Sequence, residues 1–358
     1  MPAMSAVSRM CAVIAAAGCV ISGVTLSGRQ SLSRSDGPTR PLFGSAVAAA
    51  RDLPRLYSLV VSWRGALVVE HYQRGAAATR PANVKSVSKS VISALVGIAI
   101  DRGLLRSVHE PIAPYFPDLL PVAEATRRRI TIEDLLTMRS GLETTSNRNY
   151  GAWVQSDNWV RHALLRPLLS PPGTHMDYST GNTHLLSAIL TRATGASTWR
   201  FAQDALAQPL KFSLPQWTRD PQGIYFGGNE MLLTPRQMLA FGELYLHRGA
   251  AEGRQIVPAS WIDQSFVPRG RSERGDRDDR EYGYGWWMRT LAGERTYYAW
   301  GYGGQFIFVV PSLDLVVVTT SSTAGGDERR SHRRTVNEVI EDLIIAPIAA
   351  ARSVAQGG

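Results

Sequence analysis

Two residues of this chain, Ser86 and Lys89, have the types and the spacing for nucleophilic chemistry. They lie in ANVKSVSKSVISALVG, residues 82–97, where serines and lysines come directly before an apolar run. Lysine occurs only at positions 85, 89 and 211, whereas arginine is common. A general need for positive charge therefore does not explain the lysines beside these serines.

The spacing places Ser86 and Lys89 on one face at the start of a predicted helix. A serine hydroxyl is a weak nucleophile unless a base takes its proton. A lysine amine can be that base only when it is neutral, which requires burial or nearby positive charge. Residues 91–100 are apolar nearly all round and predict a buried helix, which would favour the neutral amine. Free N–H groups in the first turn would stabilise negative charge at the serine. The S-x-x-K pattern thus indicates a serine nucleophile with a lysine base.

Two neighbours and one simpler arrangement compete with this interpretation. Ser88 would face away from Lys89, and Lys85 lies before the helix. A serine that caps the helix, followed by a surface lysine, explains the same residues without catalysis. The spacing alone leaves these alternatives open.

Two downstream segments add groups that could complete a site. Tyr178 lies in a loop just before an apolar helix, in PPGTHMDYSTGNTHLLSAIL, residues 171–190. A tyrosine in this position is also typical of simple packing. The segment AWGYGGQFIFVVP, residues 299–311, places glycines at the start of a strand, which indicates a backbone that closely approaches another group.

The elements that must position these residues are strands at the two ends of the body and helices between them. Residues 57–75 predict a hairpin that turns at Arg64-Gly65. Further strands are predicted over 283–290, 295–300, 305–311 and 314–321. Helices are predicted from the quoted segment to Gly103, over 130–140 with Thr131 as N-cap, over 183–195, over 234–249 and over 332–350.

This order predicts an α/β protein of the α+β type, with an antiparallel sheet assembled from both ends, helices on its faces and an inserted all-helical lobe. The predicted boundaries are a leader over 1–30, a linker over 31–52, a sheet domain formed by 53–110 and 245–352, and a helical lobe over 111–244.

Taken together, the segments resemble serine hydrolases related to class C β-lactamases, the group that includes penicillin-binding esterases and 6-aminohexanoate-dimer hydrolases. The resemblance covers about residues 55 to 350. It depends on the S-x-x-K segment with ITIEDLLTMRSGLE (130–143), YSTGNTHLL (178–186), LLTPRQMLAFGELYL (232–246) and GYGGQFIFVVPSLDLVVVTTSS (301–322). It implies the β-lactamase/transpeptidase-like fold.

The resemblance also implies roles for individual residues. Ser86 would be the acylated nucleophile, Lys89 its base partner and Tyr178 the tyrosine of the family's Y-x-N element. Because a phenol with a pKa of about 10 is a poor base at neutral pH, Lys89 and Tyr178 would act as one coupled titrating pair. The backbone N–H groups of Ser86 and Tyr302 would form the oxyanion hole.

Two departures from the family pattern bear on the substrate. The third residue of the Y-x-N element is Thr180, so Asn182 would have to position the substrate from a different place. No K-T-G triplet precedes the glycine-rich strand, where Trp300 and Tyr302 stand instead. Since the family's lysine there helps hold the carboxylate of a β-lactam, the aromatic rim predicts an apolar or neutral acyl group.

A segment rich in aromatic residues lies where relatives place a substrate-lining loop. It contains Tyr150, Trp153 and Trp159, and aromatic packing explains them equally well. The predicted substrate-binding residues are Tyr150, Asn182, Trp300 and Gly303.

The N-terminal segment predicts export. Arg9 precedes an apolar run over 11–26 that is too short and interrupted to be a clear membrane span. Ala16-Ala17-Gly18-Cys19 is similar to a bacterial lipobox, in which Cys19 would be lipidated and would anchor the chain to a membrane. A plain secretory signal and an uncleaved anchor stay open. The expected location is the periplasm, the cell envelope or the medium.

Composition argues against several other classes. The net charge of +9 suggests nucleic acid, but the basic residues are scattered and no compact basic face is visible. Both cysteines, Cys11 and Cys19, lie in the leader, so the body has no disulfide and no cysteine metal site. The histidines lack a metal-binding spacing, and no P-loop, H-E-x-x-H or G-x-S-x-G pattern occurs. We expect no cofactor and no nucleic-acid partner.

The sequence therefore predicts an exported serine hydrolase that forms an acyl-enzyme on an ester or a small non-peptide amide. One alternative keeps the chemistry and changes the target to a β-lactam or a D-Ala-D-Ala peptide. A further alternative is a non-catalytic binding protein of the cell envelope on the same fold, because fold does not determine function.

Overall fold

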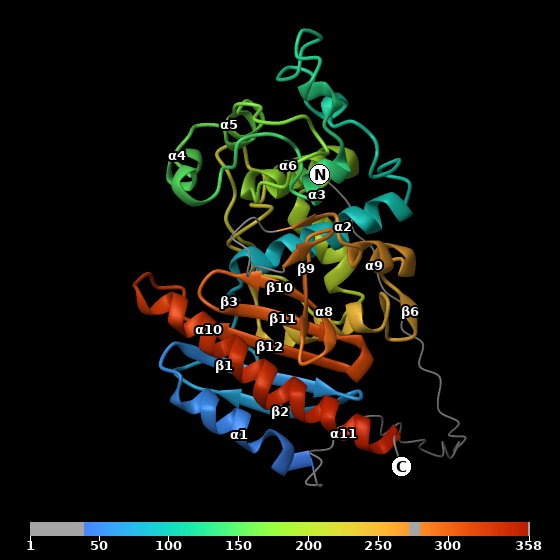
Figure 1. The fold of residues 1–358 in the computed structure, drawn as a ribbon. Helices are drawn as coiled ribbons and strands as arrows, with labels where there is room; N and C mark the ends of the chain where they lie inside the picture. Colours follow the sequence, from blue (N-terminus) through green and yellow to red (C-terminus); the bar gives the residue numbers. More distant parts are fainter. Residues whose placement is uncertain (1–38, 272–279, 357–358) are drawn as a thin grey trace, which may run out of the picture. The chain divides into compact units, whose positions relative to one another are not determined.

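An eight-stranded antiparallel sheet forms the centre of the fold (Figure 1). The computed structural model describes residues 39–271 and 280–356. The strand order is β2-β1-β12-β11-β10-β9-β8-β7. The bounds are β1 Leu56–Trp63, β2 Ala66–Tyr72, β7 Gly270–Arg271, β8 Glu281–Tyr282, β9 Trp287–Leu291, β10 Glu294–Gly301, β11 Gln305–Val310 and β12 Leu315–Ser321. Two short pairs lie outside it, β3 Ala82–Asn83 with β4 Leu232–Leu233 and β5 Ala250–Ala251 with β6 Arg254–Gln255.

Strands from the two ends of the body meet inside this sheet. β1 pairs with β12, with Val60 opposite Val318 and Val61 opposite Val317. Val60 and Val318 belong to the apolar core on one face, and Val61 and Val317 to the core on the other. Successive residues of a strand point to opposite faces, so strands that are apolar at every position need cover on both sides. The predicted antiparallel sheet, assembled from both ends and flanked by helices, is confirmed.

Turn residues explain where the strands begin and end. Arg64 and Gly65 both have positive φ, at 51° and 73°, as the predicted two-residue hairpin requires. The strand expected over 283–290 is shorter, because β9 begins only at Trp287. Gly285 has a φ of 78°, and the Gly283 amide donates to the Trp286 carbonyl at 2.9 Å, so residues 283–286 form a turn.

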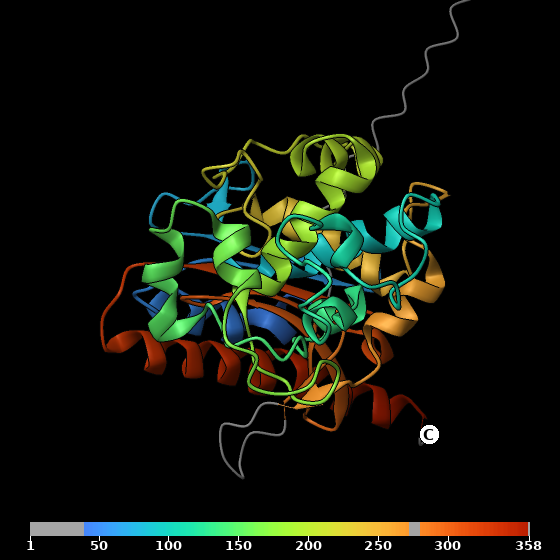
Figure 2. The same ribbon diagram turned by 90° about the horizontal axis from the view of Figure 1, so that it is seen from above.

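Helices from both ends of the body cover one face of the sheet. They are α1 Thr39–Asp52, α10 Glu328–Ile340 and α11 Ala346–Gln356, with a π-helical segment Glu341–Ile345 between the last two (Figures 1 and 2). Phe43, Ala46 and Ala50 are buried against the sheet in the core that contains Val61. The linker predicted over 31–52 is therefore wrong for 39–52, because these residues form an apolar stripe at helical spacing.

The other face carries α2 Ser88–Asp101, α8 Pro235–Leu246 and α9 Ala259–Ser265. Every residue of α2 from Ser88 to Ala99 is buried, as the apolar run predicted. Thr234 and Gln237 form a capping box that starts α8. Gly242 lets α8 lie close to the sheet, since a Cβ there would come within 2.6 Å of Val316.

The predicted helical lobe contains α3 Ile132–Leu136, α4 Tyr150–Val154, α5 Trp159–Leu164, α6 Thr180–Thr194 and α7 Thr198–Ala202. Thr131 caps α3 through a reciprocal pair of bonds with Asp134. Leu185 and Ile189 of α6 share the apolar core of Val316, and the described residues all fall within one compact unit. The predicted leader over 1–30 lies outside the described residues. Within the described part, no helix combines the length and the apolar character that crossing a membrane requires.

Gly301, the last residue of β10, lets the sheet approach the segment that carries Ser86. A Cβ at position 301 would lie 2.2 Å from the Val84 carbonyl oxygen, two residues before Ser86. A real Cβ cannot occupy that distance from backbone without moving one of the two segments. The glycine expected at a close backbone approach is therefore found beside the nucleophile segment.

We predict that Gly301→Ala separates β10 from this segment. The free energy of unfolding should fall by about 1–3 kcal/mol. The hydrolysis that the sequence predicts should fall by roughly a hundredfold, because catalysis depends steeply on small displacements of the groups involved. Urea denaturation and ester-hydrolysis rates measure the two effects.

Gly151→Ala in α4 is the matched control, because a Cβ there meets no atom within 4 Å. It should keep full stability and activity. A Gly301→Ala protein that behaves like this control would contradict the close approach.

Candidate active site

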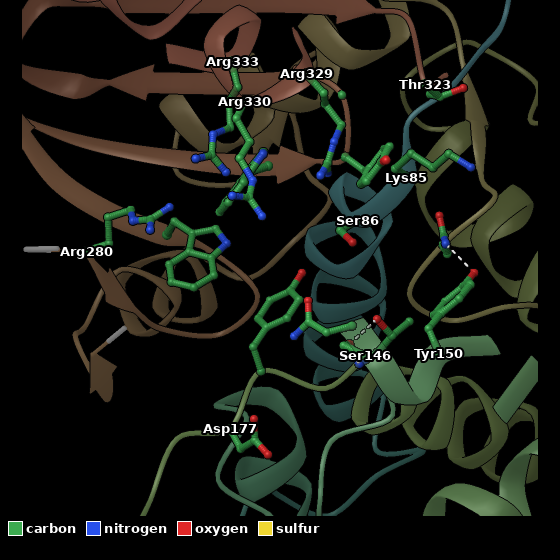
Figure 3. A pocket seen from close by; sticks show the side chains of 18 of the residues that line it. Lys85, Ser86, Ser146, Tyr150, Asp177, Arg280, Thr323, Arg329, Arg330 and Arg333 are labelled. Carbon is green, nitrogen blue, oxygen red and sulfur yellow. Dashed lines mark hydrogen bonds between the residues drawn. The ribbon is translucent and has the colours of Figure 1, made fainter. Parts of the chain in front are cut away.

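Ser86 lies in a cavity of about 830 Å³ between the helical part and the edge of β10. The lining includes Tyr178, Trp300, Tyr302 and Tyr150 (Figure 3). Ser86 is half-buried, so its hydroxyl is open to this space while its backbone belongs to the fold. The cavity is large enough for a small-molecule substrate.

A strained turn holds Ser86 at the start of α2. Ser86 is the middle residue of a 3₁₀ turn, Lys85–Val87, and Lys85 has a φ of 51°. A left-handed backbone is uncommon for a residue with a side chain and costs about 1–3 kcal/mol. Such strain persists only where neighbouring contacts over-determine the conformation.

The contacts that hold this turn involve Lys85 and Ser88, the two residues that the sequence offered as alternatives to Lys89 and Ser86. The Lys85 amide donates to Asn83 Oδ1 at 3.1 Å, and the Lys85 amine pairs with Glu230 at 2.7 Å. The Ser88 hydroxyl donates to the Lys85 carbonyl at 2.8 Å. Ser88 and Lys85 therefore have structural partners that hold the turn.

Lys89 is buried directly behind Ser86. Its side chain is 1% exposed, and its Nζ lies 3.1 Å from Ser86 Oγ. The amine also lies 2.7 Å from the Gly228 carbonyl oxygen and 3.3 Å from Thr180 Oγ1. Burial disfavours the ammonium and lowers the pKa of Lys89 from 10.5 to about 7. The amine can therefore be neutral near physiological pH.

Tyr178 completes the set that the sequence proposed. Its side chain is partly buried, it lines the cavity together with Ser86, and its ring stacks on Trp287 at a centroid distance of 5.6 Å. The Lys89 amine lies 5.1 Å from the centre of the same ring. Desolvation raises the pKa of the Tyr178 phenol above 10, and the influence of the Ser86 hydroxyl offsets only part of that rise. The structure thus brings the three side chains together, with a protonated phenol beside an amine that readily loses its proton.

A buried hydrogen bond between His184 and Asp220 supports the carbonyl that faces Lys89. His184 Nε2 and Asp220 lie 3.0 Å apart with both side chains fully buried, and the Gly227 amide donates to the His184 ring at 3.5 Å. Gly227 and Gly228 lie directly against α6, because a Cβ at either would come within 2.3 Å of Thr183. This packing fixes the Gly228 carbonyl, a partner of Lys89 that the sequence did not suggest.

The glycine-rich turn after β10 forms another wall of the cavity. Trp300, Tyr302 and Gly303 all line it, and Tyr302 is 42% exposed. Gly303 has a φ of 90°, and a Cβ there would lie 2.4 Å from the Ser322 carbonyl oxygen. A glycine is therefore required at 303 for the chain to turn between β10 and β11.

The aromatic segment divides into one cavity residue and two core residues. Tyr150 lines the cavity, and its hydroxyl accepts a hydrogen bond from Asn229 Nδ2 at 2.7 Å (Figure 3). Trp153 and Trp159 are buried and pack around His184 and Phe226. The packing explanation is therefore right for the two tryptophans.

Asn182 does not stand where substrate positioning would need it. It is 2% exposed, is not part of the cavity lining, and accepts a hydrogen bond from Ser140 at 3.1 Å. The expectation for Asn182 is corrected, because Asn182 lies two residues beyond Thr180 in α6 and its side chain is turned into the core. Thr180 lines the cavity instead, with Oγ1 2.9 Å from the Ser146 hydroxyl.

Arginines are the cavity residues that sequence reasoning missed. Arg271, Arg280, Arg329, Arg330 and Arg333 all contribute to the lining. The rim that was described from the sequence as aromatic therefore also carries positive charge. The tertiary structure brings the first turns of α10 beside Trp300, although these arginines are far from Ser86 in sequence. The helix was predicted from 332, but α10 begins at Glu328, so Arg329 and Arg330 fall in its first turn.

Comparison with known proteins identifies the family. The family model described as Beta-lactamase matches residues 47–341. The chain belongs to the β-lactamase family. The resemblance expected from the sequence is confirmed, and the fold is that of a family of hydrolases.

Individual relatives agree with this assignment. The 6-aminohexanoate-dimer hydrolase of Paenarthrobacter ureafaciens is 26% identical over 277 residues, which cover 70% of this chain and 69% of that protein. The structure of EstCE1, described as a hydrolase with promiscuous acyltransferase activity, has a TM-score of 0.70 at 18% identity and covers 86% of this chain and 98% of its own. The penicillin-binding protein of Bacillus halodurans has a TM-score of 0.64 at 15% identity and covers 84% and 100%.

We predict that activity of this β-lactamase-family member follows the titration of Lys89. Because the base must be neutral, kcat/KM for a neutral ester should rise with pH and level off above about 7. Lys89→Met should lower kcat/KM by about 10³-fold. Rates measured from about pH 5.5 to about pH 8.5 test both, and a flat profile would contradict the assignment.

The same titration should affect stability. The pKa of Lys89 is about 7 in the folded protein, against the ordinary value of 10.5 in the unfolded chain. Between these two pH values the unfolded chain therefore binds more protons than the folded protein does. Wild-type stability should therefore rise with pH across this window relative to Lys89→Met, as thermal unfolding would show. Lys211→Met is the control, since Lys211 is 70% exposed and should change neither profile.

Proposed function

We propose that the chain is a serine hydrolase that forms an acyl-enzyme on an ester or a small non-peptide amide. The observation that carries this proposal is the buried Lys89 amine 3.1 Å from the Ser86 hydroxyl in a substrate-sized cavity. A neutral amine at hydrogen-bonding distance is the requirement for activating a serine.

In the acylation step, the Lys89 amine takes the proton of the Ser86 hydroxyl. Ser86 Oγ then forms a bond to the carbonyl carbon of the substrate, and the carbonyl oxygen becomes an oxyanion. The backbone N–H groups of Ser86 and Tyr302 are the proposed donors to this oxyanion. Gly301 supports that role, because it lets the turn at Tyr302 approach the Ser86 segment. Each such donor typically contributes about 3 kcal/mol to transition-state stabilisation.

Collapse of the intermediate breaks the bond to the leaving group, which must gain a proton. The Tyr178 phenol is suited to deliver it, since desolvation raises its pKa and it lines the same cavity as Ser86. The ammonium of Lys89 then returns its proton to the phenol oxygen. Water attacks the acyl-enzyme by the reverse sequence, with Lys89 again as the base.

Lys89 and Tyr178, which the sequence suggested as one coupled pair, therefore have different roles in proton transfer. A lowered amine pKa and a raised phenol pKa make Lys89 the proton acceptor and Tyr178 the proton carrier. An ester or amide substrate is consistent with the named activities of the 6-aminohexanoate-dimer hydrolase and EstCE1.

We predict that a fluorophosphonate probe labels Ser86, since such probes react with activated serines. Mass spectrometry of digested protein identifies the labelled residue. Ser86→Ala should abolish labelling and lower hydrolysis of short-chain esters by roughly 10³-fold or more.

Ser93→Ala is the matched control, because Ser93 lies on the same helix and its buried hydroxyl has no hydrogen-bond partner in the described part of the chain. It should retain labelling at Ser86. Equal ester hydrolysis by wild type and Ser86→Ala would instead favour the non-catalytic binding protein.

One observation favours the alternative target. The arginines in the cavity could bind the carboxylate that a β-lactam or a D-Ala-D-Ala peptide carries. We predict that nitrocefin is turned over more slowly than a 4-nitrophenyl ester of a short acid, because Thr180 and Trp300 replace groups that position a β-lactam in relatives. Comparable kcat/KM values for the two compounds would favour the β-lactamase.

A further inference from the structure

His184 and Asp220 form a polar pair in the core that has no part in the proton transfers proposed above. Both side chains are fully buried, and His184 Nε2 lies 3.0 Å from Asp220 Oδ2. The rings of Trp153, Trp159 and Phe226 surround the imidazole, with centroids 5.6 to 5.8 Å from its own. Polar groups in such apolar surroundings are costly unless they are hydrogen-bonded, so the partners of the pair indicate what it does.

These partners determine which nitrogen of His184 carries the proton. The Gly227 amide donates to His184 Nδ1 at 3.5 Å, and an amide N–H can only donate, so Nδ1 is the unprotonated nitrogen. The proton of the neutral imidazole is then on Nε2, which donates to Asp220. The other oxygen of Asp220 accepts from the backbone amides of Gln222 and Ile224, at 2.9 and 2.8 Å. Asp220 therefore holds the tautomer of His184 that can accept from Gly227.

The turn that His184 contacts carries the carbonyl that faces Lys89. Gly228 follows Gly227 directly, and its carbonyl oxygen lies 2.7 Å from Lys89 Nζ. Because both residues are glycines, the turn has no side chain of its own with which to fix its orientation. Contacts of its backbone, including the hydrogen bond to His184, must therefore set the direction of the Gly228 carbonyl.

The direction of the Lys89 lone pair decides whether the amine can act as a base. A neutral amine has two N–H groups and one lone pair, and three oxygens lie around Lys89 Nζ. They are Gly228 O at 2.7 Å, Ser86 Oγ at 3.1 Å and Thr180 Oγ1 at 3.3 Å. A carbonyl oxygen can only accept, so Gly228 takes one N–H. With the second N–H on Thr180, the lone pair is directed at the Ser86 hydroxyl.

We propose that Asp220 and His184 form a positioning unit for the base, which holds the Gly228 carbonyl on the Lys89 amine and so directs the lone pair at Ser86. Both residues act through the glycine turn and neither lines the cavity. This inference rests on the proposed serine hydrolysis and adds two core residues to it.

Other charged and titratable groups lie near this unit and stay unchanged in the test. Burial lowers the pKa of Arg192, on the same helix as His184, and the negative charges of Asp118 and Asp220 offset part of that shift. Glu230, two residues beyond Gly228, pairs with Lys85 at 2.7 Å. The Tyr178 ring lies 5.1 Å from the Lys89 amine, and desolvation raises its pKa above 10. A titration near neutral pH therefore reports the amine separately from the phenol.

Asp220→Asn tests the proposal with little change in volume. The asparagine oxygen would stay with the amides of Gln222 and Ile224, so its NH₂ would face His184 Nε2. That nitrogen must then accept, which moves the imidazole proton to Nδ1, where it meets the Gly227 N–H as a second donor. We expect kcat/KM for a neutral ester to fall by about tenfold or more, because the amine loses its alignment with Ser86.

The titration of Lys89 is a readout that a merely structural role would not change. The chain has only three lysines, Lys85, Lys89 and Lys211, so carbon NMR of lysine-labelled protein follows each one, and Lys89→Met assigns the signal. A carbonyl that accepts from the ammonium favours the charged form. Its displacement in Asp220→Asn should lower the midpoint of the Lys89 titration by about half a pH unit or more.

Variants of His184 separate its two hydrogen bonds. The shorter amide of His184→Asn can place an oxygen where Nδ1 accepts from Gly227, whereas the longer amide of His184→Gln reaches Asp220 and leaves Gly227 without an acceptor. His184→Asn should therefore be about fivefold or more faster than His184→Gln in kcat/KM. The Lys89 midpoint in His184→Gln should fall as it does in Asp220→Asn.

Asp134→Asn is the matched control, since Asp134 is also a buried carboxylate that accepts a backbone N–H, that of Thr131. It should leave the Lys89 midpoint and kcat/KM unchanged. A wild-type Lys89 midpoint in folded Asp220→Asn would overturn the proposal, and so would nitrogen NMR that finds the His184 proton on Nδ1 in the wild type. If Asp220→Asn does not fold, His184→Gln and the wild-type tautomer still decide.

The NMR measurements need no substrate, so they separate this proposal from the proposed hydrolysis. If no ester is hydrolysed and Ser86 is not labelled, the hydrolysis fails by itself. A lowered Lys89 midpoint in Asp220→Asn would then still support the positioning of the amine, and an unchanged midpoint would overturn it.

Discussion

The burial of one amine beside one hydroxyl is the constraint on which the rest of the site depends. Lys89 is almost fully removed from water, and its pKa of about 7 results from that burial. The apolar helix α2, which is buried from Ser88 to Ala99, provides the low-dielectric surroundings. A solvent-exposed lysine with the same spacing from Ser86 would keep its proton and could not activate the serine. In the proposed mechanism, the core of the protein is thus part of the catalytic chemistry.

Close contacts of the backbone bring the remaining groups to this pair. Gly301 allows β10 to lie close to the segment at Val84. Gly227 and Gly228 allow their loop to pack directly against α6, and the Gly228 carbonyl then faces the Lys89 amine. The left-handed backbone at Lys85 adds local strain, and bonds from Asn83, Glu230 and Ser88 hold it. The surrounding contacts therefore hold the backbone of Lys85 in a strained conformation, as is common at functional sites.

Two kinds of basic side chain lie near Ser86. Lys89 is buried behind it, and this burial lowers the pKa of its amine to about 7. The arginines of α10 line the cavity beside Trp300 and give its wall positive charge. The amine proposed to move protons is therefore separate from the charges that line the cavity.

The sequence by itself determined the fold class, most of the elements and the set Ser86, Lys89 and Tyr178, because periodicity, caps and motif spacing are local signals. It also identified the hairpin at Arg64-Gly65 and the cap at Thr131, which depend on a few adjacent residues. Only the tertiary structure decided that residues 39–52 form a helix on the sheet, that Asn182 points into the core and that arginines of α10 reach the cavity. Those outcomes depend on which helix packs against which strand, and distances between segments remote in the chain are not encoded in any one segment.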